Sequence, residues 1–69
     1  MKSIYPNLDS LMEERKIDYL DLAMELGVAD TTMYRRLKGV SDWKLHEVFE
    51  ICKYFDNFDV EWIFRQTKV

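Results

Sequence analysis

Residues 19–39, YLDLAMELGVADTTMYRRLKG, decide the fold of this chain. The first half of the stretch places Leu22, Ala23 and Leu26 at the three- and four-residue spacing of one helix face. Gly27 follows at the point where a helix often needs a left-handed backbone position, which glycine adopts without steric cost. The pattern predicts a short amphipathic helix that ends at Gly27.

The second half of the stretch predicts another short helix, over about residues 30–38. Met33 and Leu37 mark its inner face, four residues apart, and Gly39 ends it. Two helices joined by so short a turn must cross steeply, as in a helix-turn-helix. The small side chain of Ala23 fits this arrangement, because it allows the second helix to approach the first closely.

The outer face of the second predicted helix carries hydrogen-bonding and cationic side chains. Thr31, Arg35 and Lys38 are expected to project directly outward. Thr32 and Tyr34 flank them, and Arg36 lies on the other flank. Arginine can bond both acceptors of a guanine edge, and threonine can donate to a phosphate or place its methyl group against thymine. A solvated helix face would explain such residues singly, but the pattern around them favours contact with double-stranded DNA.

The spacing of Ala23, Gly27 and Met33 resembles the helix-turn-helix of small phage regulators of the Xre/Cro class. The ending TTMYRRLKGVSDW adds to this resemblance, which covers roughly residues 7–65. Proteins of this class often have Gln where this chain has Tyr19, in contact with a DNA phosphate. The resemblance implies that the Tyr19 hydroxyl donates that bond, and that the chain is a transcriptional regulator of phage or prophage type.

The resemblance also implies the fold. We expect an all-α, lambda-repressor-like domain of about five short helices that occupies residues 1–69 as one unit, with an N-terminal arm at residues 1–6. Besides the two helices already described, the apolar spacing predicts helices over about residues 8–16, 45–55 and 60–65.

The overall net charge of −3 argues mildly against nucleic-acid binding. The charges are, however, unevenly distributed along the chain. Residues 1–29 carry three basic and six acidic residues, and residues 45–69 carry three basic and five acidic ones. Residues 30–44 carry four basic and two acidic residues, so only this segment is positive. Within it, Lys44 and the backbone amides at the start of the next helix are predicted to hold a phosphate, although Lys44 also fits a merely exposed charge.

Several residues at the predicted helix starts have capping chemistry. Asn7 is the expected N-cap of the first helix, and Asp18 that of the second, with Asp21 where a capping-box partner would lie. Ala29 precedes the third helix and cannot cap it. Asp30 then has three interpretations that the sequence leaves open: a cap, an acceptor for a cytosine amino group, or a charge that disfavours DNA.

The predicted core uses one stripe of the helix over residues 45–55. The stripe consists of Leu45, Val48, Phe49, Cys52 and Phe55. Trp43 is expected to anchor the core, and Phe58 with Ile63 or Phe64 to close it. The apolar residues expected to remain on the surface come from the group Ile51, Tyr54, Trp62 and Phe64. Such a patch often marks an interface, so a homodimer is the corresponding hypothesis.

The main rival hypothesis is a helix-turn-helix-derived protein-interaction module, antitoxin-like or a repressor partner, with little or no DNA binding. Leu20 and Met24 favour it, because they lie off the inner stripe of their helix; packing against the first helix is the alternative. With one Cys and one His, the chain has no zinc-site pattern. We see no catalytic pair, cofactor motif, small-molecule site or membrane span, and expect a non-enzymatic cytoplasmic protein of a bacterial or phage-infected cell.

Overall fold

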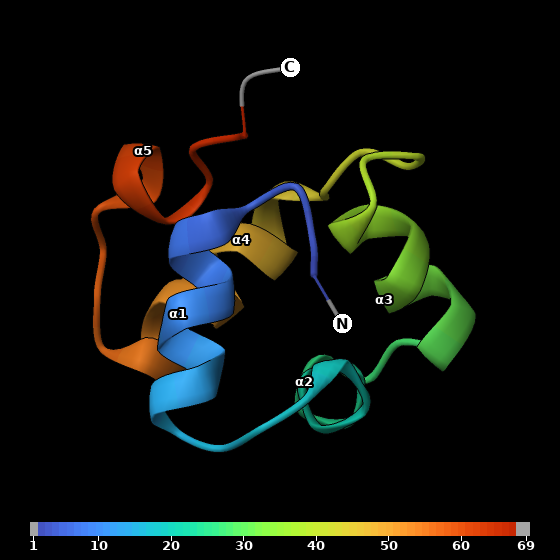
Figure 1. Ribbon diagram of the computed structural model, residues 1–69. Helices are drawn as coiled ribbons and strands as arrows, with labels where there is room; N and C mark the ends of the chain where they lie inside the picture. The colour runs from blue at the N-terminus through green and yellow to red at the C-terminus, as the bar shows by residue number, and fades with distance from the viewer. Residues whose placement is uncertain (1, 68–69) are drawn as a thin grey trace.

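Five short helices make up the fold in the computed structural model, which describes residues 2–67 (Figure 1). They are α1 (Pro6–Glu14), α2 (Tyr19–Leu26), α3 (Asp30–Leu37), α4 (Leu45–Phe55) and α5 (Val60–Ile63). Residues 2–67 contain no strand. The predicted all-α bundle is confirmed, with α4 at its expected bounds and α5 shorter than expected.

Helix α1 begins at Pro6, two residues before the predicted start. Proline suits the first helical position, because the amide hydrogen that it lacks would have no partner there. The N-cap is Tyr5, with no capping side chain, so the prediction that Asn7 caps this helix is wrong. Asn7 lies inside α1, and its side-chain amide donates to the Trp62 carbonyl oxygen at 2.8 Å. Asn7 therefore ties α1 to α5.

The turn between α2 and α3 has the predicted geometry. Asp18 accepts hydrogen bonds from the amides of Leu20 and Asp21, while the Asp21 carboxylate accepts from the Asp18 amide. Gly27 has a φ of +69°, in the left-handed region, and ends α2 as expected. Ala23 is fully buried where α2 packs against α3, as the close-approach argument requires.

The N-terminal segment packs against the bundle and does not extend from it as an arm. Ser3 and Tyr5 are buried. The Ile4 amide donates to the Leu37 carbonyl oxygen at 3.0 Å, and the Ile4 carbonyl oxygen accepts from the Thr67 amide at 2.8 Å. Residues 2–5 thus join the end of α3 to the last described residues of the chain.

An aromatic cluster anchors the loop between α3 and α4 to the core. Trp43 meets Tyr5 edge to face, with ring centroids 6.1 Å apart, and Phe64 at 5.3 Å. Tyr5 and Phe64 are also in contact, at 5.7 Å. Such edge-to-face pairs stabilise aromatic clusters beyond the area that they bury. The predicted anchoring role of Trp43 is confirmed.

The buried face of α4 confirms part of the predicted stripe, since Cys52 and Phe55 are buried and Val48 packs against the core, but the positions of Leu45 and Phe49 were predicted wrongly. Leu45 is 70% exposed and Phe49 is 50% exposed, whereas Ile51 is fully buried together with Cys52. The helix is rotated so that Glu47 also points inward and is buried. The reason is an ion pair with α3, described below, which apolar spacing within one helix cannot reveal.

The surface apolar residues are consequently not those predicted. Ile51 is fully buried, whereas Tyr54, Trp62 and Phe64 are half-buried and pack against the core. Phe58 was expected to close the core but is 61% exposed, and Ile63 takes that role. The exposed large apolar side chains are Leu20, Met24, Tyr34, Val40, Leu45, Phe49, Phe58 and Val60.

Candidate nucleic-acid interface

Helix α3 presents one free face because its other face is fixed in the core. Met33 and Leu37 are fully buried, which confirms their predicted inward position. In Figure 1, α3 stands at the right of the molecule, away from α1 and α5. Thr31 and Arg35 are exposed, and Thr32 is half-buried at the edge of the same helix. The predicted outward direction of Thr31 and Arg35 is therefore confirmed.

Arg36 does not belong to the exposed face, contrary to its predicted place on a flank. Its Nε atom lies 2.8 Å from Glu47 Oε1, and both side chains are buried. Its Nη1 donates to the Asp42 carbonyl oxygen at 2.7 Å. The same Glu47 carboxylate accepts from the Lys44 amide at 2.8 Å. One buried ion pair thus joins α3, the following loop and the start of α4.

Lys38 is half-buried and leans back toward the protein, although the spacing predicted that it projects directly outward. Its ammonium group donates to the Lys2 carbonyl oxygen at 2.9 Å. It also lies 5.7 Å from the centre of the Tyr34 ring, within cation–π range. Tyr34 in turn meets Tyr19 edge to face at 5.8 Å. The structure thus brings Tyr19, Tyr34 and Lys38 together in one cluster beside α3.

The starts of α2 and α3 differ in whether a side chain accepts hydrogen bonds from their backbone amides. At the start of α2, the Asp18 carboxylate accepts hydrogen bonds from two backbone amides. At the start of α3, the N-cap Ala29 supplies no side-chain bond. Among the hydrogen bonds of residues 2–67, the Asp30 side chain makes none, so the interpretation of Asp30 as a cap is wrong and Asp30 is an exposed carboxylate. The first-turn amides of α3 therefore remain open to an acceptor.

Lys44 lies at the N-cap position of α4 with its side chain exposed. The Glu47 carboxylate accepts a hydrogen bond from the Lys44 backbone amide, and its negative charge is paired with Arg36. The side chain of Lys44 is therefore an exposed cation next to a helix start, the arrangement that attracts an anion.

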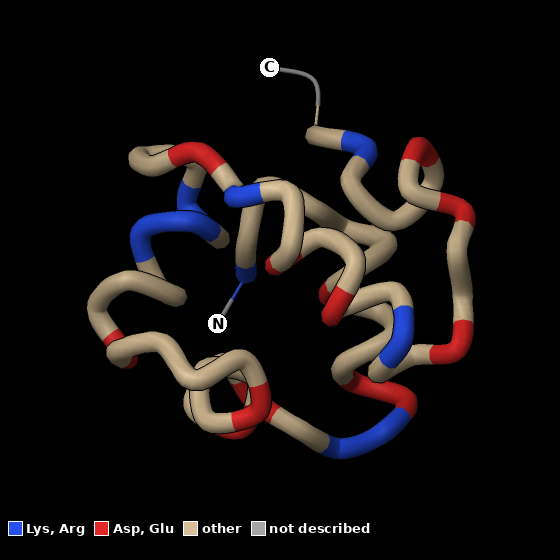
Figure 2. Tube along the Cα trace, turned by 180° about the vertical axis from the view of Figure 1, so that it is seen from behind, with Lys and Arg blue, Asp and Glu red and all other residues tan. Residues whose placement is uncertain are grey.

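The cationic residues gather at one side of the molecule. Figure 2 shows Lys and Arg gathered in α3 and the loop that follows it, at the left, and shows acidic residues in this region too as well as over the rest of the chain. Since Arg36 is paired with Glu47, the positive charge on this side comes chiefly from the exposed Arg35 and Lys44 and from the half-buried Lys38. This side is the one that the sequence predicted to be positive.

Comparison with known proteins agrees with this geometry. Residues 7–57 match the model of the Cro/C1-type helix-turn-helix (HTH) DNA-binding domain. The chain belongs to this family. A search of curated proteins and a search of solved structures each found no match. As a member of the Cro/C1-type family, the chain is a DNA-binding protein, and α2 and α3 form its helix-turn-helix.

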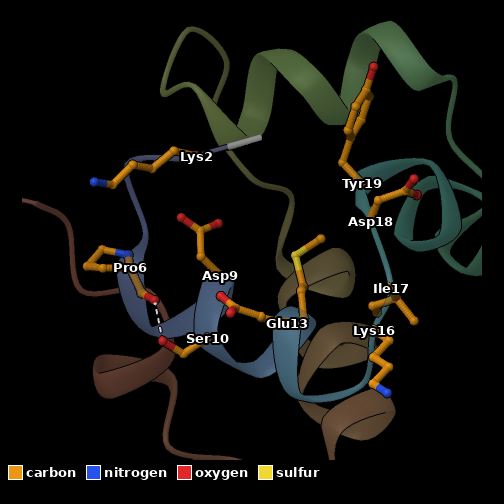
Figure 3. A pocket seen from close by; sticks show the side chains of 10 residues that line it. Lys2, Pro6, Asp9, Ser10, Glu13, Lys16, Ile17, Asp18 and Tyr19 are labelled. Carbon is orange, nitrogen blue, oxygen red and sulfur yellow. Dashed lines mark hydrogen bonds between the residues drawn. The ribbon is translucent and has the colours of Figure 1, made fainter.

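A groove of about 710 Å³ lies beside the helix-turn-helix of this Cro/C1-type domain (Figure 3). It runs between α1, the N-terminal segment and the start of α2, and ends at Tyr19. Asp9, Glu13 and Asp18 line it, with Lys2 at one end. Lys16 lines the groove as well, so three carboxylates outnumber two lysines there. The groove is therefore a poorer place for a phosphate than the surface of α3.

Two residues that support the candidate interface were not predicted from the sequence. Glu47 fixes the start of α4, and its place three residues after Lys44 is the signal that could have found it, because a Glu there commonly accepts from the N-cap amide. Lys2 supplies the carbonyl oxygen that holds Lys38. No local pattern could have found Lys2, since the two residues are far apart in sequence.

The remaining polar and titratable groups do not suggest a further site. Cys52 is fully buried, which confirms its predicted place in the core, and this burial raises the pKa of its thiol. His46 is exposed on α4. Within residues 2–67, no cluster of His, Cys, Asp and Glu could hold a metal ion. No helix in the same residues is long and apolar enough to cross a membrane.

Proposed function

We propose that this chain is a sequence-specific transcriptional regulator of phage or prophage type, and that α3 enters the major groove of double-stranded DNA. One observation carries the proposal: Arg35 and Thr31 are exposed on the face of α3 opposite the buried Met33 and Leu37. A helix held from behind in this way presents fixed side chains to base edges, as helix-turn-helix recognition requires.

The proposed roles follow the chemistry of each side chain. Arg35 bonds the two acceptors of a guanine edge, while Thr31 and Thr32 contact a base or a phosphate. Lys44 holds a phosphate beside the start of α4, and the Tyr19 hydroxyl reaches a phosphate on the α2 side. Lys38 contributes positive charge to the same surface while bound to the Lys2 carbonyl oxygen.

The assembly proposed for this function is a homodimer in which two α3 helices read half-sites about one DNA turn apart. Leu45 and Phe49 support it, because they leave an apolar strip exposed on successive turns of α4. We further propose that residues 1–69 act as one domain in a bacterial cytoplasm, by occupancy of the DNA alone, without enzymatic activity, cofactor or small-molecule ligand.

Selection from a pool of random duplex DNA at near-physiological salt tests the proposal. Protein shown to be folded by circular dichroism should enrich one motif, and two half-sites in inverted repeat would support the homodimer. A single half-site would contradict the homodimer but not the recognition. If folded protein enriches no sequence, sequence-specific recognition is wrong.

A second candidate function is a protein-interaction module that keeps the helix-turn-helix frame. Met24, which is 82% exposed, and Leu20 favour it, because packing against α1 does not cover them. The dependence of affinity on salt separates the two candidates. DNA binding weakens steeply with salt as counterions rebind to phosphates, whereas binding through an apolar patch changes little.

A further inference from the structure

An aromatic ring remains exposed in the middle of α3. The other two large apolar residues of this helix, Met33 and Leu37, are fully buried, but Tyr34 is 44% exposed. Tyr34 lies one turn after Thr31 and next to Arg35, so it borders the face to which we assign base recognition. The ring therefore lies beside the proposed DNA-binding face.

The Tyr34 ring is held in position before any ligand arrives. Tyr19 packs against it edge to face, with a centroid distance of 5.8 Å and an interplanar angle of 63°. The Lys38 ammonium lies 5.7 Å from the ring centre and is itself bound to the Lys2 carbonyl oxygen. A ring fixed in this way loses little conformational entropy on binding, so its contact contributes to affinity with a small ordering cost.

The chemistry of the major groove gives this ring one matching group. Among the base edges of that groove, only the 5-methyl group of thymine is apolar, and it distinguishes thymine from the other bases. We infer that Tyr34 contacts this methyl group and makes the chain selective for thymine at one position of its site. A bond from the Tyr34 hydroxyl to a phosphate is the competing assignment, and the Tyr34→Phe variant separates the two.

This inference rests on the proposed function, because it requires α3 in the major groove. The test starts from the motif recovered by selection and replaces each thymine in turn by uracil, which removes only the methyl group. Burial of one methyl group corresponds to about a fourfold change in affinity. We expect a loss of about this size at one thymine of each bound half-site, and no comparable loss for Tyr34→Ala protein at the same position.

Three protein variants make the result specific. Tyr34→Phe keeps the ring and should retain the response to uracil, whereas loss of affinity in Tyr34→Phe equal to that in Tyr34→Ala would establish the phosphate contact instead. Thr31→Ser removes a threonine methyl group that offers a competing apolar contact on α3. An unchanged response to uracil keeps the assignment on Tyr34, and loss of the response would move it to Thr31. Phe58→Ala removes an exposed aromatic ring outside α3 and should bind like the unmodified protein.

The outcomes separate this inference from the function on which it rests. If folded protein selects a motif but no thymine-to-uracil change weakens binding, the inference is wrong while sequence-specific recognition stands. The inference is also wrong if the uracil effect persists undiminished in Tyr34→Ala. If folded protein selects no motif, both are wrong. A melting curve for each variant checks that altered binding does not result from unfolding.

Discussion

At the scale of single residues, Arg35 is the side chain that should carry most sequence information. It is exposed on α3 and makes no hydrogen bond or ion pair among residues 2–67, so its guanidinium is available to a base. Arg35→Ala should reduce discrimination at one base pair by about 1–3 kcal/mol, the value of a good bidentate contact. Competition binding against single-base variants of the selected motif measures this. Lys53→Ala, an exposed cation on α4, is the matched control, and unchanged discrimination by Arg35→Ala would refute the assignment.

Lys44 should behave differently, since a phosphate contact carries no base information. Lys44→Ala should weaken binding to all sequences about equally and reduce the slope of log affinity against log salt by about one. Titrations of the motif and of a scrambled duplex at several salt concentrations check both effects. A loss confined to the motif would assign Lys44 to base recognition instead.

At the scale of helices, the Arg36–Glu47 ion pair determines how α3 meets α4. Removal of one partner leaves the other charge buried, so Glu47→Leu should destabilise the fold by about 3–5 kcal/mol. The double variant Arg36→Met with Glu47→Leu removes both charges and should recover most of that loss. Urea unfolding of the single and double variants measures the difference. Equal stability of the two would show that the ion pair does not couple these helices.

The crossing of α2 and α3 depends on the small size of Ala23. Ala23→Leu adds volume to a fully buried position and should destabilise the fold by about 1–3 kcal/mol. Met24→Leu is the matched control, because Met24 is the next residue in the chain and is 82% exposed. An unchanged melting temperature for Ala23→Leu would contradict the close approach of the two helices.

At the scale of the whole molecule, the exposed α4 strip should govern assembly. If the proposed homodimer forms through this strip, sedimentation at tens of micromolar should show a dimer, and Phe49→Ser should shift it to monomer without loss of helicity. Phe58→Ser, also an exposed phenylalanine, should leave the assembly unchanged. A monomer that dimerises only on DNA would restrict the homodimer to the bound state.

The sequence pattern predicted the features that depend on neighbouring residues, and it missed those that depend on residues far apart in the chain. The end of α2 at Gly27 and the cap at Asp18 depend on nearby backbone, so the local pattern predicted them. The buried face of α4 depends on Arg36 of another helix, so treating α4 alone placed Cys52 correctly but Leu45 wrongly. Lys38 was expected to project outward, but its ammonium group is hydrogen-bonded to the Lys2 carbonyl oxygen. The outward position of Arg35 was predictable because its inward neighbours Met33 and Leu37 are unambiguous.

The division of α3 into an inner and an outer face has a consequence for how such a protein changes over evolutionary time. The buried ion pair between Arg36 and Glu47 fixes the inner face of α3. The exposed side chains of Thr31 and Arg35 take no part in that packing. If α3 reads DNA as proposed, substitutions at those two outer positions should alter the preferred DNA sequence with little effect on stability. New binding preferences are thus accessible by single steps, without a compensating change in the core.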